Sequence, residues 1–188
     1  PIFMPLIVLK TSLFVVPSIG LLVYYYINFI TIIIVLSTII FPLLSTLFLI
    51  QRGRVASLEM ANYKERSAPL MYSALIMLVG YWILKPILTM APVLEAEFLA
   101  TIIIVSIASF ISKYWKISLH MLGVGAAAGA FVGIHVLYGG LEKLIILAIL
   151  ISGILGVARI NEGAHNHTQV YVGFLFGFFI QLCGLLFF

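Results

Sequence analysis

Residues 158–169 read ARINEGAHNHTQ, a short polar stretch between two long apolar segments. The stretch holds an arginine, two histidines, a glutamate and a glutamine. Ionisable side chains are costly in the hydrocarbon of a bilayer, so this cluster must lie at a membrane surface or in a wet cavity. It therefore indicates where the membrane ends and where a functional site is to be sought.

The composition is that of a membrane protein. Hydrophobic residues make up 64% of the 188 residues and charged residues 9%, whereas soluble domains contain about 25% charged residues. The apolar runs are continuous rather than alternating, which predicts helices and argues against a barrel. We expect a single transmembrane domain over residues 1–188, an all-α bundle of six to seven helices. The formal net charge of +4 fits loop cations near lipid headgroups and indicates no nucleic-acid partner.

The apolar runs predict seven helical segments, since a span needs roughly 20 residues. The expected segments are about 4–25 (broken or re-entrant), 28–50, 69–88, 97–113, 117–138, 142–158 and 168–188. A short helical piece is expected at 57–60, inside the polar loop 51–68. Glu95 and Glu97 fall in the turn before the fourth segment. Apart from Lys10, no charged residue then lies in mid-span, which argues against a proton-relay transporter.

Counting these spans brings three polar corners to one membrane face. Two spans separate the loop 51–68 from the corner 113–120, and two more separate that corner from 159–167. The shared face then carries the following cations and histidines: Lys64, Arg66, Lys116, His120, Arg159 and His165.

Small residues predict which helices pack together. Gly125, Gly129 and Gly133 recur every four residues in the fifth segment, and Gly173 and Gly177 repeat that spacing in the seventh. Small residues at this period allow helix backbones to approach closely. We expect the fifth and seventh helices to pack, which brings His120 and His165 together at their N-terminal ends.

Such a constellation is suited to phosphoryl transfer. That reaction needs positive charge around three phosphoryl oxygens and an in-line nucleophile, and a helix N-terminus near Ser118 supplies further N–H groups. Two histidines can serve as nucleophile and proton donor. His165 and His167 are also spaced as a metal pair, but no third ligand is evident.

The motifs resemble those of the PAP2 (type 2 phosphatidic acid phosphatase) superfamily over about residues 57–177. That family carries Lys-x6-Arg-Pro, Pro-Ser-Gly-His and Ser-Arg-x5-His-x3-Asp. Arg159 and His165 fit the third motif without a gap, and Ser118 and His120 fit the second. Arg66, with Pro69 nearby, resembles the arginine of the first.

This sequence departs from the family pattern at several positions. Glu59 stands where the first motif has lysine, and Lys64 is a candidate to replace that charge. Ile117 and Leu119 replace the proline and glycine of the second motif, and Ala158 replaces the serine of the third. Gln169 replaces the aspartate that would orient the nucleophilic histidine. We expect Gln169 to lie one turn into the seventh helix and to hydrogen-bond the ring of His165, because residues three to four apart on a helix share a face. A glutamine can accept this bond but cannot balance an imidazolium charge.

The resemblance implies two alternative functions. The first is hydrolysis of a lipid phosphate, such as phosphatidate or a polyprenyl diphosphate, through a phosphohistidine. His165 would be the nucleophile, His120 the proton donor and Gln169 the orienting group. The phosphate would be held by the remaining residues, Arg66, Arg159, Lys64, Ser118 and Lys116. No metal or cofactor would be required.

The second function is that of a catalytically inactive PAP2-like protein, a structural or lipid-binding subunit of a membrane complex. The departures at Glu59, Ala158 and Gln169 favour it. The expected partners are a phosphorylated lipid and membrane lipids, with membrane-complex partners under the second function. The expected location is the bacterial cytoplasmic (inner) membrane. Most loop cations fall on the motif face, which the positive-inside rule places in the cytoplasm, whereas the resemblance to PAP2 proteins, which often work on the outer face, leaves the outer face as the alternative.

Overall fold

The computed structural model describes residues 4–15, 20–58, 60 and 62–187, and these residues form helices and loops without a strand. Within this part of the chain, six helical stretches are long and apolar enough to cross a membrane. They are Tyr25–Gln51, Tyr63–Leu88, Pro92–Ile111, Leu119–Tyr138, Glu142–Asn161 and His167–Phe187. The prediction of an all-α bundle with six to seven apolar helices is confirmed.

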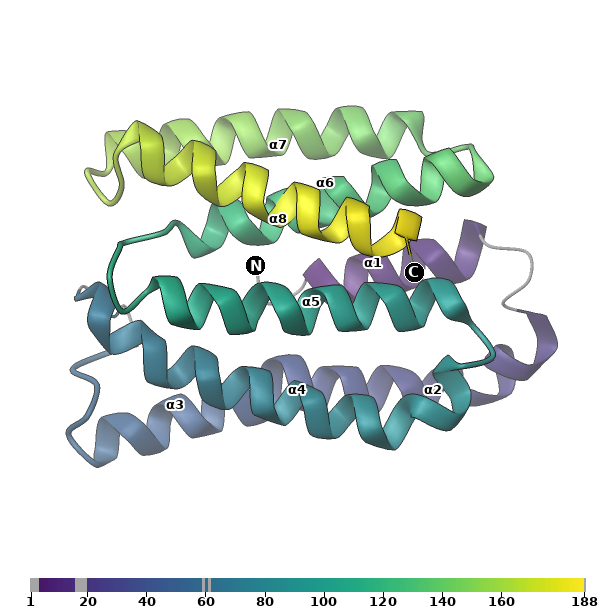
Figure 1. The fold of residues 1–188 in the computed structure, drawn as a ribbon, viewed down its shortest axis with the longest axis horizontal. Coiled ribbons are helices and arrows are strands. Elements are labelled where there is room, and N and C mark those ends of the chain that lie inside the picture. Colours follow the sequence, from purple (N-terminus) through teal and green to yellow (C-terminus); the bar gives the residue numbers. More distant parts are fainter. Residues whose placement is uncertain (1–3, 16–19, 59, 61, 188) are drawn as a thin grey trace.

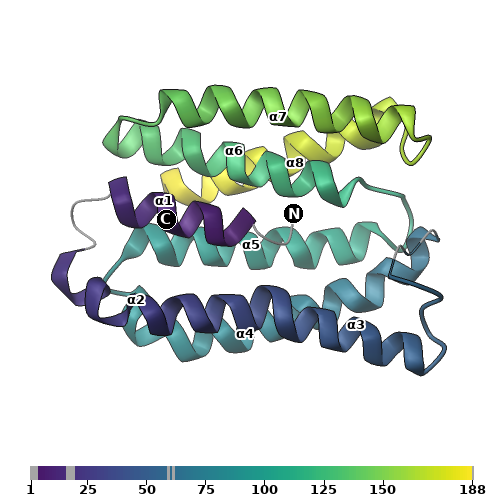
Figure 2. The same cartoon turned by 180° about the vertical axis from the view of Figure 1, so that it is seen from behind.

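The first helix that the structure describes, α1 (Met4–Val15), is too short over these residues to span a membrane. Its 12 residues extend about 18 Å at 1.5 Å per residue, whereas the hydrocarbon core is about 30 Å thick. It lies against α5 and α6 instead (Figure 2). The predicted helix over 4–25 is therefore divided between α1 and the start of α2, and Pro17, its expected interruption, lies outside the described residues.

The stretch after α1 is one long helix with a widened turn. It consists of α2 (Gly20–Val35), a π-helical turn (Leu36–Ile40) and α3 (Phe41–Gln51). Pro42 is the second residue after the end of the π-helical turn. A proline inside a helix lacks an N–H and its ring collides with the carbonyl four residues earlier. A widened turn in front of Pro42 relieves that collision and keeps the helix continuous.

The next two helices begin earlier than the sequence predicted. A 3₁₀ turn at Tyr63–Arg66 leads into α4 (Ser67–Leu88), and residues 57, 58 and 60 of the predicted helical piece are not helical. The following helix, α5 (Pro92–Ile111), starts at Pro92 rather than at 97. Proline is well suited to the first helical turn, where its missing N–H needs no partner. Glu95 and Glu97 consequently lie inside α5 and are buried, not in a turn.

The last three helices form one group. They are α6 (Leu119–Tyr138), α7 (Glu142–Asn161) and α8 (His167–Phe187). A Cβ added at Gly125 or Gly129 of α6 would overlap the backbone carbonyl of Phe174 or Phe178, and one at Gly177 would overlap that of Leu122. Only glycine permits backbones to lie this close, so the predicted packing of α6 against α8 is confirmed.

Figure 1 shows α5 between two groups of helices, with α6, α7 and α8 on one side and α2, α3 and α4 on the other. The largest hydrophobic core joins both groups and includes Ile30, Leu84, Leu88, Phe98, Phe131 and Ile134. The loops joining α3 to α4, α5 to α6 and α7 to α8 all lie at one end of the bundle in both views (Figures 1 and 2). This arrangement brings together the three polar corners that span counting predicted.

Candidate functional site

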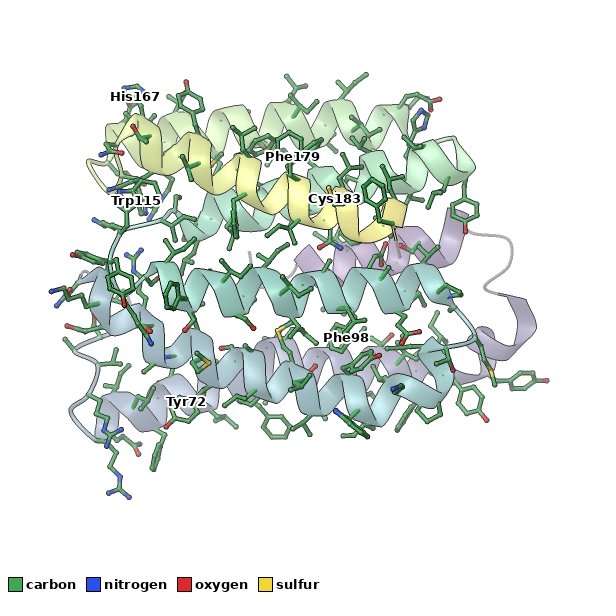
Figure 3. The ribbon with its side chains drawn as sticks, in the orientation of Figure 1. Tyr72, Phe98, Trp115, His167, Phe179 and Cys183 are labelled. Carbon is green, nitrogen blue, oxygen red and sulfur yellow. The ribbon has the colours of Figure 1, made fainter. Side chains whose placement is uncertain are left out.

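Four predicted residues from the three corners line one cavity of about 460 Å³. Arg66 lies just before α4, His120 in the first turn of α6, Arg159 in the last turn of α7, and His165 in the loop before α8. The side-chain view shows Trp115 and His167, neighbours of two of these corners, at the same end of the bundle (Figure 3). The predicted convergence of these four side chains is confirmed.

Both arginines line the cavity and are held by partners that the motifs do not contain. Arg66 is 9% exposed, and its Nε donates to the carbonyl of Met60 at 3.0 Å. Arg159 donates from Nη1 to Glu162 Oε2 at 2.9 Å. Its Nε is buried without a hydrogen-bond partner among the described residues. Two guanidinium groups facing one cavity repel each other, and an anion between them would relieve that repulsion.

His165 is oriented by Gln169. The ring Nδ1 lies 3.0 Å from Gln169 Oε1, which also accepts from the backbone N–H of Asn166 at 3.3 Å. Because this oxygen acts as an acceptor, we assign the ring proton to Nδ1, which leaves the Nε2 lone pair free. The predicted hydrogen bond is confirmed.

The surroundings of His165 favour the neutral imidazole. Burial lowers the pKa of His165, the hydrogen bond that the ring donates to Gln169 opposes that shift, and the positive charges of Arg66, Lys116 and Arg159 lower the pKa further. A neutral imidazole with a free Nε2 lone pair is the form that can attack phosphorus.

The start of α6 contributes His120 and Ser118. His120 is half-buried and lines the cavity. Ser118 is fully buried, and its Oγ has no hydrogen-bond partner among the described residues. Its backbone N–H donates to the Gln169 carbonyl at 3.4 Å, which ties the starts of α6 and α8 together. Ser118 does not line the cavity itself.

The remaining predicted site residues are placed differently. Lys64 is exposed and does not line the cavity, so its predicted role in place of the motif lysine finds no contact there. Lys116 does not line the cavity either but acts on His165 through its charge. Glu59 lies outside the described residues. His167 is exposed and stacks on Tyr171, with 6.4 Å between ring centroids, whereas His165 is buried.

Sequence reasoning missed two features of the cavity. Glu162, the partner of Arg159, could have been recognised because side chains three residues apart are neighbours on a helix. Glu97 and Gln181 line the same cavity. Their positions depend on contacts between distant helices, for which the sequence carries no local signal.

Comparison with protein-family models, with curated proteins and with solved structures found no match for this chain.

Proposed function

We propose that this chain is a membrane lipid-phosphate phosphatase of PAP2 type. One observation carries the proposal: a single cavity is lined by two arginines and two histidines at one end and by apolar side chains from α2 to α6 along its length. Cavities of 300–1,000 Å³ with mostly apolar linings and a few convergent polar groups are typical of ligand sites. An amphiphile with a phosphate head matches both parts of this lining.

The proposed reaction uses the residues in the roles that their geometry allows. Arg66 and Arg159 bind the phosphoryl oxygens and offset the charge of the transition state. The Nε2 of His165 attacks phosphorus, forming an N–P bond as the bond from phosphorus to the lipid oxygen breaks. His120 must carry a proton before the attack begins, and it gives that proton to the departing oxygen. Water then attacks the phosphohistidine, returns a proton to His120 and releases phosphate.

The second candidate is a catalytically inactive PAP2-like protein that binds lipid or serves a membrane complex. Gln169 favours it, because an amide orients His165 without stabilising the imidazolium charge. The salt bridge from Arg159 to Glu162 favours it too, because a carboxylate there competes with a bound phosphate. For either candidate we propose the bacterial cytoplasmic membrane as the setting, from the resemblance and the loop cations alone.

Release of phosphate by the purified chain in lipid nanodiscs tests the proposal. Phosphatidate and a polyprenyl diphosphate are the substrates, and acid-labile labelling of the protein by radioactive phosphate reports the phosphohistidine. His165→Ala should abolish both signals while leaving the bundle folded. His167→Ala, two residues away and exposed, is the matched control and should retain both. Full activity in His165→Ala would refute the assignment of His165 as the nucleophile. No release of phosphate by the parent protein would favour the second candidate.

A further inference from the structure

The cavity extends far beyond the proposed phosphate site. Besides the four polar residues at the end that holds the three corners, its lining includes Leu88, Leu94, Phe98 and Gln181, from the other half of the bundle. Gln181 lies twelve residues beyond Gln169 on α8. At 1.5 Å per residue the two positions are about 18 Å apart along the helix axis. Phe98, and Cys183, which lies two residues after Gln181, are well away from the end that holds His167 (Figure 3).

A second group of polar side chains lies beside the deep part of the cavity. We call Ser12, Glu97 and Gln181 the distal polar cluster. Ser12 Oγ donates to Glu97 Oε1 at 2.6 Å, and Gln181 Nε2 donates to the Glu97 backbone carbonyl at 3.2 Å. The three residues come from α1, α5 and α8, so the cluster exists only in the folded bundle. All three are buried, but only Glu97 and Gln181 line the cavity.

One acceptor in this cluster is left unsatisfied. Gln181 is 2% exposed, and its Oε1 has no hydrogen-bond partner among the described residues. Buried polar atoms nearly always have partners, and leaving one without a partner is costly. The cost is not reduced by water in a bilayer interior. Because Gln181 lines a ligand-sized cavity, a hydroxyl group on the cavity's occupant would satisfy this acceptor.

We propose that the distal polar cluster is a second binding subsite, which accepts a hydrogen bond from a hydroxyl group at the far end of a single-chain lipid phosphate. The phosphate end of this ligand rests on the proposed function; the hydroxyl end rests on Gln181 and Glu97 alone. A neutral hydroxyl fits better than an ammonium group, because the ligand must pass through an apolar cavity in which a charge is costly.

The distance between the two ends sets the length of the chain. Carbon–carbon bonds of about 1.5 Å advance an extended chain by about 1.3 Å per bond, so about 18 Å corresponds to roughly fourteen carbons. A chain of this size also suits the cavity volume of about 460 Å³, since a cavity of about 150 Å³ already accommodates benzene. The subsite thus favours a medium-length, unbranched chain that lies inside the protein.

Binding of two matched phosphonates tests the subsite without requiring turnover. Tetradecyl phosphonate and ω-hydroxytetradecyl phosphonate differ only in the terminal hydroxyl, and neither can be hydrolysed at the carbon–phosphorus bond. Calorimetric titration of the full chain in nanodiscs should show about tenfold tighter binding of the hydroxylated compound, which is the expected effect of satisfying a buried acceptor. Equal affinities in the parent protein would overturn the proposal, as would a failure of both compounds to bind.

Variants locate the effect. Gln181→Leu should remove the preference for the hydroxylated phosphonate by lowering the affinity for that compound alone. Ser73 is another polar residue of the cavity lining, and Ser73→Ala should leave the preference intact. An unchanged preference in Gln181→Leu would overturn the proposal. If that variant does not fold, a chain-length series in the parent decides: the preference should peak near fourteen carbons and vanish for an octyl chain, and a preference independent of length would overturn it.

The same compounds distinguish this proposal from the proposed function. If the corresponding alkyl phosphates are not hydrolysed but the hydroxylated phosphonate binds more tightly, the proposed phosphatase activity is refuted and the proposed subsite is supported. If phosphatidate is hydrolysed and the two phosphonates bind equally, the proposed subsite is refuted and the proposed phosphatase activity is supported.

Discussion

His165 and Gln169 are joined by a hydrogen bond of 3.0 Å between the ring Nδ1 and the amide Oε1. The bond links the loop after α7 to the first turn of α8, and the N–H of Asn166 fixes the same oxygen from the other side. Gln169 itself is held by Asn166, whose Oδ1 accepts from the Gln169 backbone N–H at 2.9 Å. The imidazole is thus firmly oriented, but by a neutral group.

Replacing that neutral group by a carboxylate should increase phosphatase activity. Gln169→Asp adds the charge that stabilises the imidazolium character developing on His165 as it attacks. The corresponding carboxylate of a serine triad is worth about four decades in rate, so a gain of about tenfold is a conservative expectation for a shorter side chain at this position. Phosphate release from phosphatidate measures it. Gln169→Leu, which removes the bond without adding charge, should lose activity, and equal rates in all three proteins would contradict the role.

The pH dependence of activity should reflect the lowered pKa of His165. A lowered pKa means that the nucleophile stays neutral as the medium becomes acidic, so activity should persist below about pH 6.5, the ordinary histidine value. Because the folded chain takes up this proton less readily than the unfolded chain, the free energy of unfolding should rise with pH between the lowered pKa and about 6.5. The pH–rate profile and unfolding in detergent measure the two effects.

Lys116→Gln provides the control for this assignment. Removing one cation near His165 should raise the pKa of His165, so the acid limb of the rate profile should move to higher pH. Because parent and variant use the same substrate, titration of the substrate phosphate cancels in the comparison. An acid limb at the same pH in both proteins would show that another group controls it.

Removing the acidic partner of Arg159 should strengthen phosphate binding. Glu162 is 59% exposed at its side chain and occupies Nη1 of Arg159. Exposed ion pairs are worth about 0–1 kcal/mol, so Glu162→Gln should lower KM by no more than about fivefold, with little change in kcat. Glu142→Gln, near His135 at the other end of the bundle, is the control and should leave KM unchanged. A higher KM in Glu162→Gln would mean that the salt bridge positions Arg159 for substrate.

The sequence predicted the polar end of this molecule well because the relevant signals are local. Helix length and span counting depend only on runs of apolar residues, and these placed Arg66, His120, Arg159 and His165 at one end. The bond between His165 and Gln169 follows from four-residue spacing across a helix start. The glycine periods in α6 and α8 identified the helix pair because close approach requires small residues on both helices.

The parts that sequence reasoning missed depend on contacts between distant segments. Glu97 was assigned to a turn because charged residues are expected outside the membrane, but Ser12 of α1 and Gln181 of α8 satisfy part of its hydrogen-bonding capacity inside the bundle. The carbonyl of Met60 that binds Arg66 belongs to a residue with a φ of 47°, a conformation that nothing in its side chain predicts. Lys64, chosen for its charge alone, faces outward.

Adding a single methyl group to the contact between α6 and α8 should destabilise the protein and reduce its activity. In Gly125→Ala the new Cβ would overlap the Phe174 carbonyl, a backbone atom that cannot move without shifting α8. Overpacking of this kind costs about 1–3 kcal/mol. Gly153→Ala, on the same group of helices, adds its methyl group to open space, and should be neutral or stabilising by up to about 1 kcal/mol, since alanine favours a helix over glycine. Thermal unfolding in detergent separates the two variants.

Because α6 carries His120 and α8 begins beside His165, the shift should also lower phosphate release in Gly125→Ala but not in Gly153→Ala. Equal stability of the two variants would mean that the helices tolerate a wider spacing than their glycines indicate.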